Sequence, residues 1–269
     1  MEEYEKYFET NQKLWDSKTP IHLSSDFYNM DGFVKGGSSL RKIELSELPD
    51  VNGKSILHTQ CHFGQDTLSL ERMGGNCTGI DFSPVAISTA SKIRDEIGLK
   101  SRFIRCNMYE VDKHLNEDFD LVYTSYGVIA WLPNLHLWAE QISKRLKPGG
   151  LFYMAEFHPV LYMFDWGKNE IAYDYFNQEK PHMETLKGTY AVPEAGIEMK
   201  EYFWQHSLSE VFQSLLNNDL EIIQFNEYDY SPYDCFDNLV KRKDQEYVFR
   251  HSDTNLPHVF TLMCRKKNK

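Results

Sequence analysis

The sequence predicts an α/β protein built on a doubly wound, mostly parallel sheet. From residue 55 onward, short runs rich in β-forming residues alternate with helical patterns, which is typical of strands joined by crossover helices. The links between them are short, as a doubly wound fold requires. The predicted strands lie at 55–61, 76–81, 101–107, 119–125 and 150–157, and the predicted helices lie near 66–73, 84–97 and 134–146.

Several predicted helix boundaries coincide with side chains that bond free backbone groups. Ser83 can cap one helix, with Pro84 at its first position. Asn134 can cap the next helix in the same way. Ser207 begins a capping-box pattern, which predicts a helix that runs to about residue 218.

Two late runs, 220–228 and 258–266, are β-like and have no convincing helical pattern between them. They predict an antiparallel pair at one edge of the sheet. The segment 158–205 is long for a connection within a compact domain and is rich in aromatic residues. It is therefore either a surface hairpin packed on the core or a lid over the carboxyl edge of the sheet.

The part of the chain before the first strand has a different character. It holds a charged helical stretch, YEKYFETNQKLWD, a loop and a second predicted helix at 38–48. We therefore divide the chain into an N-terminal helical segment, 1–50, and a main domain, 51–269, in which 158–205 is an insertion on the substrate side.

Composition disfavours several classes of protein. The 29 basic and 40 acidic side chains give a formal net charge of −11, which argues against sequence-independent binding to nucleic acid. No run approaches the roughly 18 apolar residues that a bilayer span needs, and the opening residues are too acidic for a signal peptide, so we expect a soluble, cytoplasmic protein. The five cysteines form no C-x-x-C pair, so neither a disulfide framework nor a cysteine-rich zinc site is predicted.

The carboxyl ends of the strands hold the candidate ligand-binding residues, because ligands of doubly wound sheets lie there. Gly64 in the first turn lets the backbone approach a ligand closely, and the backbone N–H groups from Gln65 onward begin a helix. Asp81 ends the second strand, where a carboxylate accepts hydrogen bonds from ribose hydroxyls in nucleotide-binding folds.

Four further segments strengthen this pattern: GIDFSP after strand two, CNMY after strand three, YTSYGVIAWL after strand four and LKPGGLFYMAEFHP around strand five. In this order, from roughly residue 50 to 160, the sequence resembles the class I S-adenosylmethionine-dependent methyltransferases. The resemblance implies a Rossmann-like sheet of seven strands with the last strand antiparallel, and an N-terminal segment that folds over the cofactor as a lid.

The resemblance also implies S-adenosylmethionine as cofactor, bound along the first four strand ends. The first loop would lie beside the amino-acid part of the cofactor. Asp81 would bind the ribose, and Phe82 would lie beside the adenine. The implied cofactor-binding residues are Gln60, Cys61, His62, Gly64, Gln65, Asp66, Asp81, Phe82, Asn107, Met108, Thr124, Ser125 and Tyr126.

The first loop departs from the family's pattern of an acidic residue followed by alternating glycines. In this chain the positions of that pattern are occupied by His58, Gln60, His62 and Gly64, so only the last glycine is kept. Either Asp66 or the N-terminal segment replaces the missing acidic residue, or cofactor binding is weak. We favour replacement, because the chain looks like a branch of the family with a Q-C-H-x-G-x-D-T loop and a long N-terminal extension.

The same loop could be interpreted as a metal site. However, the side chains of His58, Cys61 and His62 should point in different directions on a strand that leads into a tight turn. Burial or hydrogen bonding to the backbone is the better interpretation, and no metal site is predicted.

Five residues are candidates for contact with a methyl acceptor. Tyr126 and His158 follow strands four and five and are the predicted catalytic residues; His158 is otherwise a turn residue. Trp131 is either a wall of the acceptor or cofactor site or a packing residue. Trp15 and Tyr28 belong to the N-terminal segment, which folds over the cofactor in related enzymes.

The predicted function is transfer of a methyl group to a small-molecule acceptor. Nucleic-acid acceptors are disfavoured by the charge and because TSYGV lacks a Pro-Pro-aromatic tetrapeptide, while protein acceptors stay open. A nicotinamide-dependent dehydrogenase is disfavoured by the absence of G-x-G-x-x-G after strand one. The altered first loop keeps open a third hypothesis, a non-catalytic nucleotide-binding or regulatory protein. The sequence predicts no oligomeric state.

Overall fold

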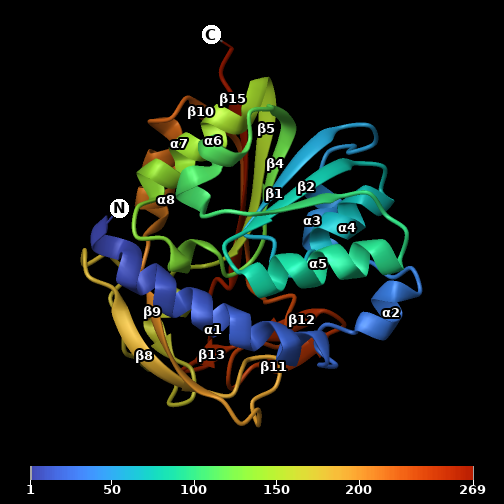
Figure 1. Ribbon diagram of the computed structural model, residues 1–269. Helices are drawn as coiled ribbons and strands as arrows, with labels where there is room; N and C mark the ends of the chain where they lie inside the picture. Colours follow the sequence, from blue (N-terminus) through green and yellow to red (C-terminus); the bar gives the residue numbers. More distant parts are fainter. Residues whose placement is uncertain (1, 269) are drawn as a thin grey trace.

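The computed structural model describes residues 2–268, and a seven-stranded sheet forms its centre (Figure 1). The strand order is β10-β15-β5-β4-β1-β2-β3. The first five strands are parallel, and β15 runs antiparallel to both of its neighbours, as predicted. The strands are β1 (Ser55–Thr59), β2 (Asn76–Asp81), β3 (Arg102–Arg105), β4 (Phe119–Thr124), β5 (Leu146–Phe157), β10 (Leu220–Tyr228) and β15 (Val259–Lys266).

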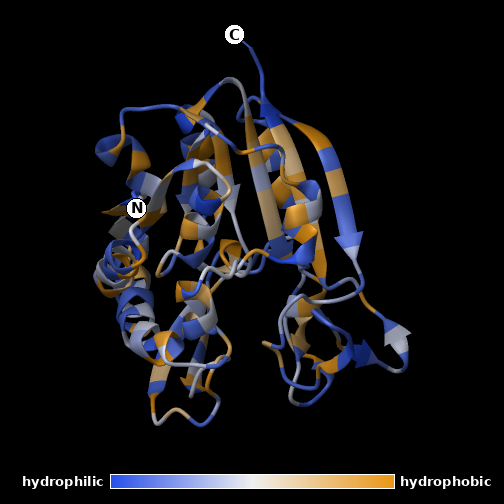
Figure 2. Ribbon diagram, turned by 90° about the vertical axis from the view of Figure 1, so that its right-hand side faces the viewer, coloured by the Kyte–Doolittle hydropathy of each residue, from blue (hydrophilic) through white to orange (hydrophobic). Residues whose placement is uncertain are grey.

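Helices cover both faces of this sheet (Figure 1). Neighbouring residues of β1 show the consequence, since Ile56 and Leu57 enter two different hydrophobic cores. Figure 2 shows hydrophobic residues along the central strands. The helices of the main domain are α4 (Gln65–Arg72), α5 (Pro84–Glu96), η2 (Met108–Glu110), α6 (Val111–His114), η3 (Ile129–Trp131), α7 (Leu135–Arg145), η4 (Leu161–Met163) and α8 (Leu208–Leu216).

The three predicted helix caps are confirmed. The Ser83 hydroxyl accepts a hydrogen bond from the backbone N–H of Ala86 (3.0 Å), and the Asn134 amide oxygen accepts one from Leu137 (3.0 Å). Ser207 accepts one from the N–H of Glu210 (3.2 Å). Each bond satisfies a donor that the first helical turn leaves free.

The N-terminal segment differs from its prediction in extent. It consists of η1 (Glu2–Tyr4), α1 (Glu5–Leu23), α2 (Met30–Val34) and α3 (Lys42–Glu47). The charged stretch is the start of a helix that continues through Pro20, and the predicted helix at 38–48 is only the short α3. Strand β5 also starts earlier than predicted, at Leu146, because Leu146 already pairs with Phe119 of β4. The register then shifts across the Pro-Gly-Gly segment, and regular pairing resumes at Leu151.

The insertion contains two β-hairpins, β6 (Phe164–Asp165) with β7 (Glu170–Ile171) and β8 (His182–Lys187) with β9 (Glu198–Phe203). The second hairpin packs on α1 (Figure 1). The Asn11 side chain fastens the two by donating to the Tyr202 carbonyl (2.7 Å) and accepting from the Tyr202 N–H (2.9 Å). The insertion and α1 therefore form one layer over the carboxyl edge of the sheet.

The segment between the two late strands holds short strands and, within the described residues, no helix. They are β11 (Val240–Lys243), β12 (Glu246–Val248), β13 (Arg250–His251) and β14 (Thr254–Asn255). Among residues 2–268, none of the helices is both long and apolar enough to cross a membrane.

Candidate active site

A hollow lies at the carboxyl ends of β1, β2, β3 and β4, and its volume of about 380 Å³ includes the open solvent at its mouth. The sequence predicts the ligand at this edge, and five of the predicted cofactor-binding residues line the hollow together with residues from α1 and η3. The lining residues are Phe8, Gln60, Ile80, Asp81, Phe82, Cys106, Asn107, Met108, Trp131 and Leu132.

Asp81 is held at the wall of this pocket by backbone donors. One carboxylate oxygen accepts the N–H of His62 (2.9 Å) and the other accepts the N–H of Ser83 (2.8 Å). Burial raises the pKa of the Asp81 carboxyl to about 6. Each oxygen has a second lone pair, so the fixed carboxylate can still accept hydrogen bonds from ligand hydroxyls.

Gln60 and His62 stand where the family's loop has glycines, and both have left-handed backbone conformations, with φ of 53° and 50°. The Gln60 amide nitrogen donates to the Val128 carbonyl (3.0 Å). Its amide oxygen is buried and has no hydrogen-bond partner among the described residues. A buried acceptor without a partner at a pocket wall is suited to a ligand N–H group.

Helix α1 covers this pocket, as the resemblance implied for the N-terminal segment, but the residues that hold it there were not predicted. Phe8 lines the hollow, and the side chain of Gln12 donates to the Phe82 carbonyl (2.6 Å). Asp16 accepts a hydrogen bond from the Ser83 hydroxyl (2.5 Å). These contacts join residues about 70 positions apart, so no local pattern in the sequence could have indicated them.

The loop after β4 is held by the carboxylate of Glu156, a fully buried residue of β5. It accepts the N–H groups of Gly127 (2.5 Å), Val128 (2.8 Å) and Ile129 (3.1 Å). Burial raises the pKa of Glu156 to about 6. The sequence analysis missed this role, although an acidic residue within an apolar strand was the available signal.

Trp131 and Asn107 both line the pocket. The indole N–H of Trp131 donates to the Gly127 carbonyl (2.6 Å), which fixes the ring at the wall. The amide oxygen of Asn107 accepts the N–H of Tyr109 (3.0 Å), and Met108 beside it is buried.

Other predicted cofactor residues do not line the hollow. The Thr124 hydroxyl bonds to Thr59 (2.7 Å), and the Ser125 hydroxyl lies 3.3 Å from Nε2 of His58. Cys61 is buried. These side chains connect strand ends instead of facing the pocket.

Three first-turn positions have a structural task. Gly64 has φ of +82°, and a Cβ there would lie 2.6 Å from the Phe103 ring. Gln65 donates to the Tyr28 carbonyl (2.9 Å), and Asp66 accepts from the Ser39 hydroxyl (2.6 Å). These residues bind the N-terminal segment to α4. Among residues 2–268, the structure holds no group of three His, Cys, Asp or Glu side chains suited to a metal ion.

Tyr126 belongs to a second cluster at the end of β4. Its ring packs against Tyr233 (5.2 Å between centroids), and its hydroxyl bonds to the buried Glu44. The Arg41 guanidinium lies 4.4 Å from the centre of the Tyr233 ring. Its Nε is buried without a hydrogen-bond partner, and no carboxylate of the described residues forms an ion pair with Arg41. The sequence analysis missed Arg41 and Glu44.

His158 has both ring nitrogens engaged. Nε2 lies 2.9 Å from a carboxylate oxygen of Glu227, and Nδ1 accepts the N–H of Val160 (3.1 Å). Its ring therefore has no free nitrogen for a substrate in this arrangement, and its predicted catalytic role stays a prediction.

Trp15 and Tyr28 join the N-terminal segment to the site. The Trp15 ring packs edge-on against Trp131 (5.4 Å) and His62 (5.2 Å). The Tyr28 hydroxyl bonds to the hydroxyl of Tyr190 in the insertion (2.5 Å). The structure thus brings both residues next to the first loop, and their contact with an acceptor stays a prediction.

Comparison with known proteins agrees with this fold and site. Residues 57–152 match a family model described as a methyltransferase domain. The sheet order, the antiparallel last strand and this match confirm, for fold and domain family, the predicted resemblance to class I S-adenosylmethionine-dependent methyltransferases. Residues 57–152 are thus similar to a methyltransferase domain, and the sheet has the predicted seven-stranded fold.

Individual relatives are distant. The chain is 28% identical over 126 residues to an uncharacterized methyltransferase of Synechocystis, a match that covers 46% of this chain and 57% of the relative. It is 23% identical over 164 residues to the ubiquinone biosynthesis O-methyltransferase of Dechloromonas aromatica, covering 60% of this chain and 66% of the relative. The matches therefore span less than two thirds of these curated relatives.

A solved structure is similar over nearly the whole chain. The S-adenosylmethionine-dependent methyltransferase of Clostridium acetobutylicum superposes with a TM-score of 0.57 at 15% identity, over 98% of this chain and 99% of that one. At this identity the likeness concerns the fold.

Proposed function

We propose that this protein transfers the methyl group of S-adenosylmethionine to a small-molecule acceptor. The observation that carries the proposal is the pocket at the carboxyl edge of the sheet, which is lined by Asp81 and by Gln60 with its partnerless amide oxygen. When bound, S-adenosylmethionine supplies an electrophilic methyl group on a positively charged sulfur.

The residues of the pocket fit the cofactor's chemistry. The fixed carboxylate of Asp81 can accept hydrogen bonds from the ribose hydroxyls, and Phe82 and Met108 offer apolar surface to the adenine. The Gln60 amide oxygen can accept from the ammonium group of the methionine part.

Arg41 is the candidate for the cofactor's carboxylate. Arg41 is half-buried, its Nε has no hydrogen-bond partner, and no carboxylate of the described residues forms an ion pair with it. Burial lowers the pKa of its guanidinium, but Tyr233, and then Asp66 on α4 and Glu44, raise the pKa on balance. A guanidinium binds a carboxylate through parallel hydrogen bonds. We infer that Arg41 binds the carboxylate of the cofactor, while the Gln60 amide oxygen accepts from its ammonium group.

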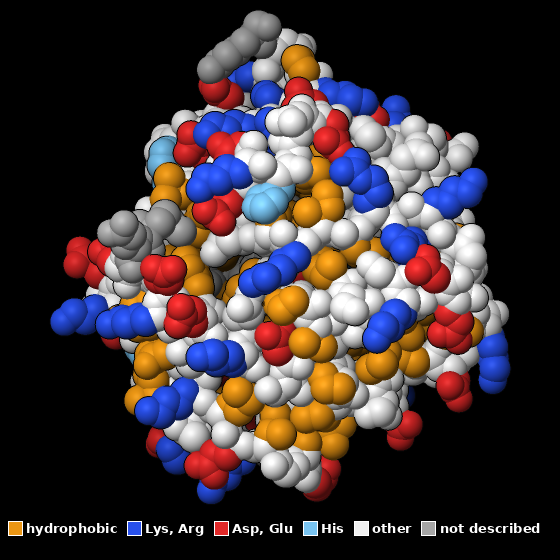
Figure 3. All heavy atoms as spheres, viewed as in Figure 1, with side chains coloured by type: hydrophobic (Ala, Val, Ile, Leu, Met, Phe, Trp, Pro, Cys, Tyr) orange, Lys and Arg blue, Asp and Glu red, His pale blue; other side chains and the backbone are white. Residues whose placement is uncertain are grey.

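The acceptor side is formed by aromatic residues of several elements. Tyr126 follows β4, and Trp131 contributes to the pocket itself. We keep Tyr126 as the candidate for acceptor contact. Two similar proteins are named as O-methyltransferases of ubiquinone biosynthesis, which supports a small-molecule acceptor. On the face shown in Figure 3, acidic and basic side chains are interspersed, and no extended basic patch is visible.

The test is an acceptor screen that measures formation of S-adenosylhomocysteine from S-adenosylmethionine. Turnover with a small molecule that is lost in Asp81→Ala and kept in the exposed control Asp31→Ala would support the proposal. Binding of the cofactor without turnover on any acceptor would favour the non-catalytic hypothesis instead.

A further inference from the structure

Lys18 and His22 lie one turn apart on the inner side of α1 and are almost completely buried, with 3% and 0% of their surface exposed. The ammonium of Lys18 forms a long ion pair with the carboxylate of Glu201 on β9, at 3.7 Å. Neither ring nitrogen of His22 has a hydrogen-bond partner among the described residues. Burial of the His22 nitrogens without partners is unfavourable, so His22, with the Lys18 ammonium one turn away, is suited to a ligand that supplies the missing acceptor.

Aromatic rings surround the two side chains. The Lys18 ammonium lies 5.1 Å from the centre of the Trp15 ring and 5.7 Å from that of Trp131. The His22 ring lies 5.3 Å from the Tyr28 ring and 4.7 Å from the Tyr190 ring. Flat walls of this kind favour a planar ligand.

The other titratable groups around His22 are already engaged. Tyr28 and Tyr190 bond to each other through their hydroxyls. His62, 5.3 Å away between ring centroids, has its Nε2 at 3.5 Å from the Thr19 hydroxyl. Glu201 faces Lys18 from β9. No protein group therefore competes with a ligand for the nitrogens of His22.

The charges favour an anionic oxygen. Burial, together with the neighbouring Lys18, lowers the pKa of His22 to about 3, so the neutral ring offers one N–H donor. Burial lowers the pKa of Lys18, and the Glu201 carboxylate opposes this shift. Protonated Lys18 offers three donors and a positive charge. An ionised oxygen can accept from both side chains at once, and such charge-assisted bonds are the strong ones.

We propose that Lys18 and His22 bind the anionic oxygen of the methyl acceptor, a planar acidic molecule of the phenol or aromatic carboxylic acid class. This inference rests on the proposed methyl transfer. Trp131 connects the two sites, because it lines the cofactor pocket and also lies over Lys18. An acceptor held between Lys18 and His22 would therefore lie beside the cofactor.

The test uses para-nitrophenol, whose ionised form alone absorbs visible light, and benzoate as a competitor. Both are titrated into the protein saturated with S-adenosylhomocysteine. The wild type should bind para-nitrophenol as its ionised form, and benzoate should displace it. Lys18→Met should weaken binding about tenfold or more, and so should His22→Phe, because each removes a donor to the anion.

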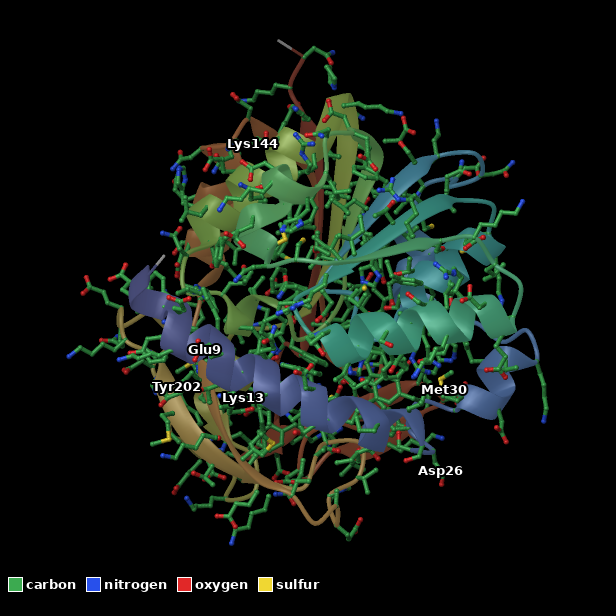
Figure 4. All side chains as sticks on the ribbon, in the orientation of Figure 1. Glu9, Lys13, Asp26, Met30, Lys144 and Tyr202 are labelled. Carbon is green, nitrogen blue, oxygen red and sulfur yellow. The ribbon has the colours of Figure 1, made fainter. Side chains whose placement is uncertain are left out.

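The matched control is Lys13→Met, which removes a lysine from the exposed side of the same helix (Figure 4). It should leave binding of the probe unchanged. A melting curve of each variant separates loss of the ligand site from loss of the fold. The absorption spectrum of the bound probe reports its ionisation state in the wild type alone. The proposal can therefore be tested even if Lys18→Met does not fold.

Three outcomes would overturn the inference. They are binding of para-nitrophenol in its neutral form, no binding of either probe, and unchanged probe affinity in folded Lys18→Met.

The cofactor's own carboxylate is a second source of an anionic oxygen. If Lys18→Met weakens binding of S-adenosylhomocysteine but not of methylthioadenosine, which lacks that carboxylate, the site belongs to the cofactor and the acceptor assignment is wrong. Failure of the wild type to bind S-adenosylhomocysteine would instead contradict the proposed function.

Discussion

The hydroxyl of Tyr126 donates a hydrogen bond of 2.7 Å to the carboxylate of Glu44, which lies 82 positions earlier in the chain. Glu44 is fully buried, and burial raises its pKa to about 7. The bond joins α3 of the N-terminal segment to the end of β4, where the candidate acceptor contact stands. The N-terminal segment therefore both covers the pocket, through α1, and fixes the position of Tyr126, through α3.

This raised pKa makes the stability depend on pH. The pKa of Glu44 rises on folding from 4.5 to about 7, so the folded protein binds the proton more tightly than the unfolded chain. The contribution of Glu44 is fully present below its unfolded pKa and is lost as the pH rises through the folded pKa. Between these values the free energy of unfolding should fall by about 3 kcal/mol because of this group.

Glu44→Gln should remove that part of the pH dependence, as measured by urea unfolding at a series of pH values. Asp81 and Glu156 also have raised pKa values, so a smaller slope should remain. Glu9→Gln on the exposed side of α1 is the control and should keep the wild-type slope. Equal slopes in wild type and Glu44→Gln would show that Glu44 is not responsible.

Gln60→Gly tests whether the unusual first loop serves the cofactor. Glycine should relieve about 1 kcal/mol of left-handed strain, and loss of the bond to Val128 should cost about 1 kcal/mol, so stability should change little. Affinity for S-adenosylhomocysteine should fall about tenfold, because the amide oxygen that receives the ammonium group is lost. Calorimetric titration measures the affinity, and thermal melting measures the stability.

Asp253→Gly is the matched control for this substitution. Asp253 also has a positive φ, of 60°, but lies in an exposed turn between β13 and β14. The control should leave cofactor affinity unchanged. Affinity that is unchanged in Gln60→Gly as well would rule out a role for this side chain.

Glu156→Gln should destabilise the protein by about 3 kcal/mol, because an amide cannot accept all the backbone N–H groups that the carboxylate holds. Hydrogen exchange should show faster exchange at Gly127, Val128 and Ile129. Glu140→Gln breaks only a surface ion pair with Lys144 and should have little effect. Unchanged protection of the three amides would contradict the assigned role of Glu156.

The parts of the fold that depend on local chemistry could be predicted from the sequence. Ser83 and Asn134 cap their helices because the cap and the bonded N–H are three positions apart. Asp81 lies at the pocket because it ends a parallel strand, and ligands of a doubly wound sheet lie at the carboxyl ends of its strands. These predictions needed no knowledge of distant contacts.

Other parts of the site depend on tertiary contacts and could not be predicted in this way. Arg41 and Glu44 reach the end of β4 only through the packing of the N-terminal segment. Thr124 was assigned to the cofactor, but its hydroxyl bonds to Thr59 on the neighbouring strand. The departure of Gln60 from glycine was visible in the sequence, but its left-handed backbone and partnerless amide oxygen were not.

The most direct test of the central claim is calorimetric titration with S-adenosylmethionine, S-adenosylhomocysteine and NAD. The account predicts that wild type and Asp31→Ala bind the first two compounds and do not bind NAD. In Asp81→Ala this binding should be lost, because the carboxylate at the pocket wall is removed. Absence of binding to both sulfur compounds in the wild type, or a preference for NAD, would contradict the account.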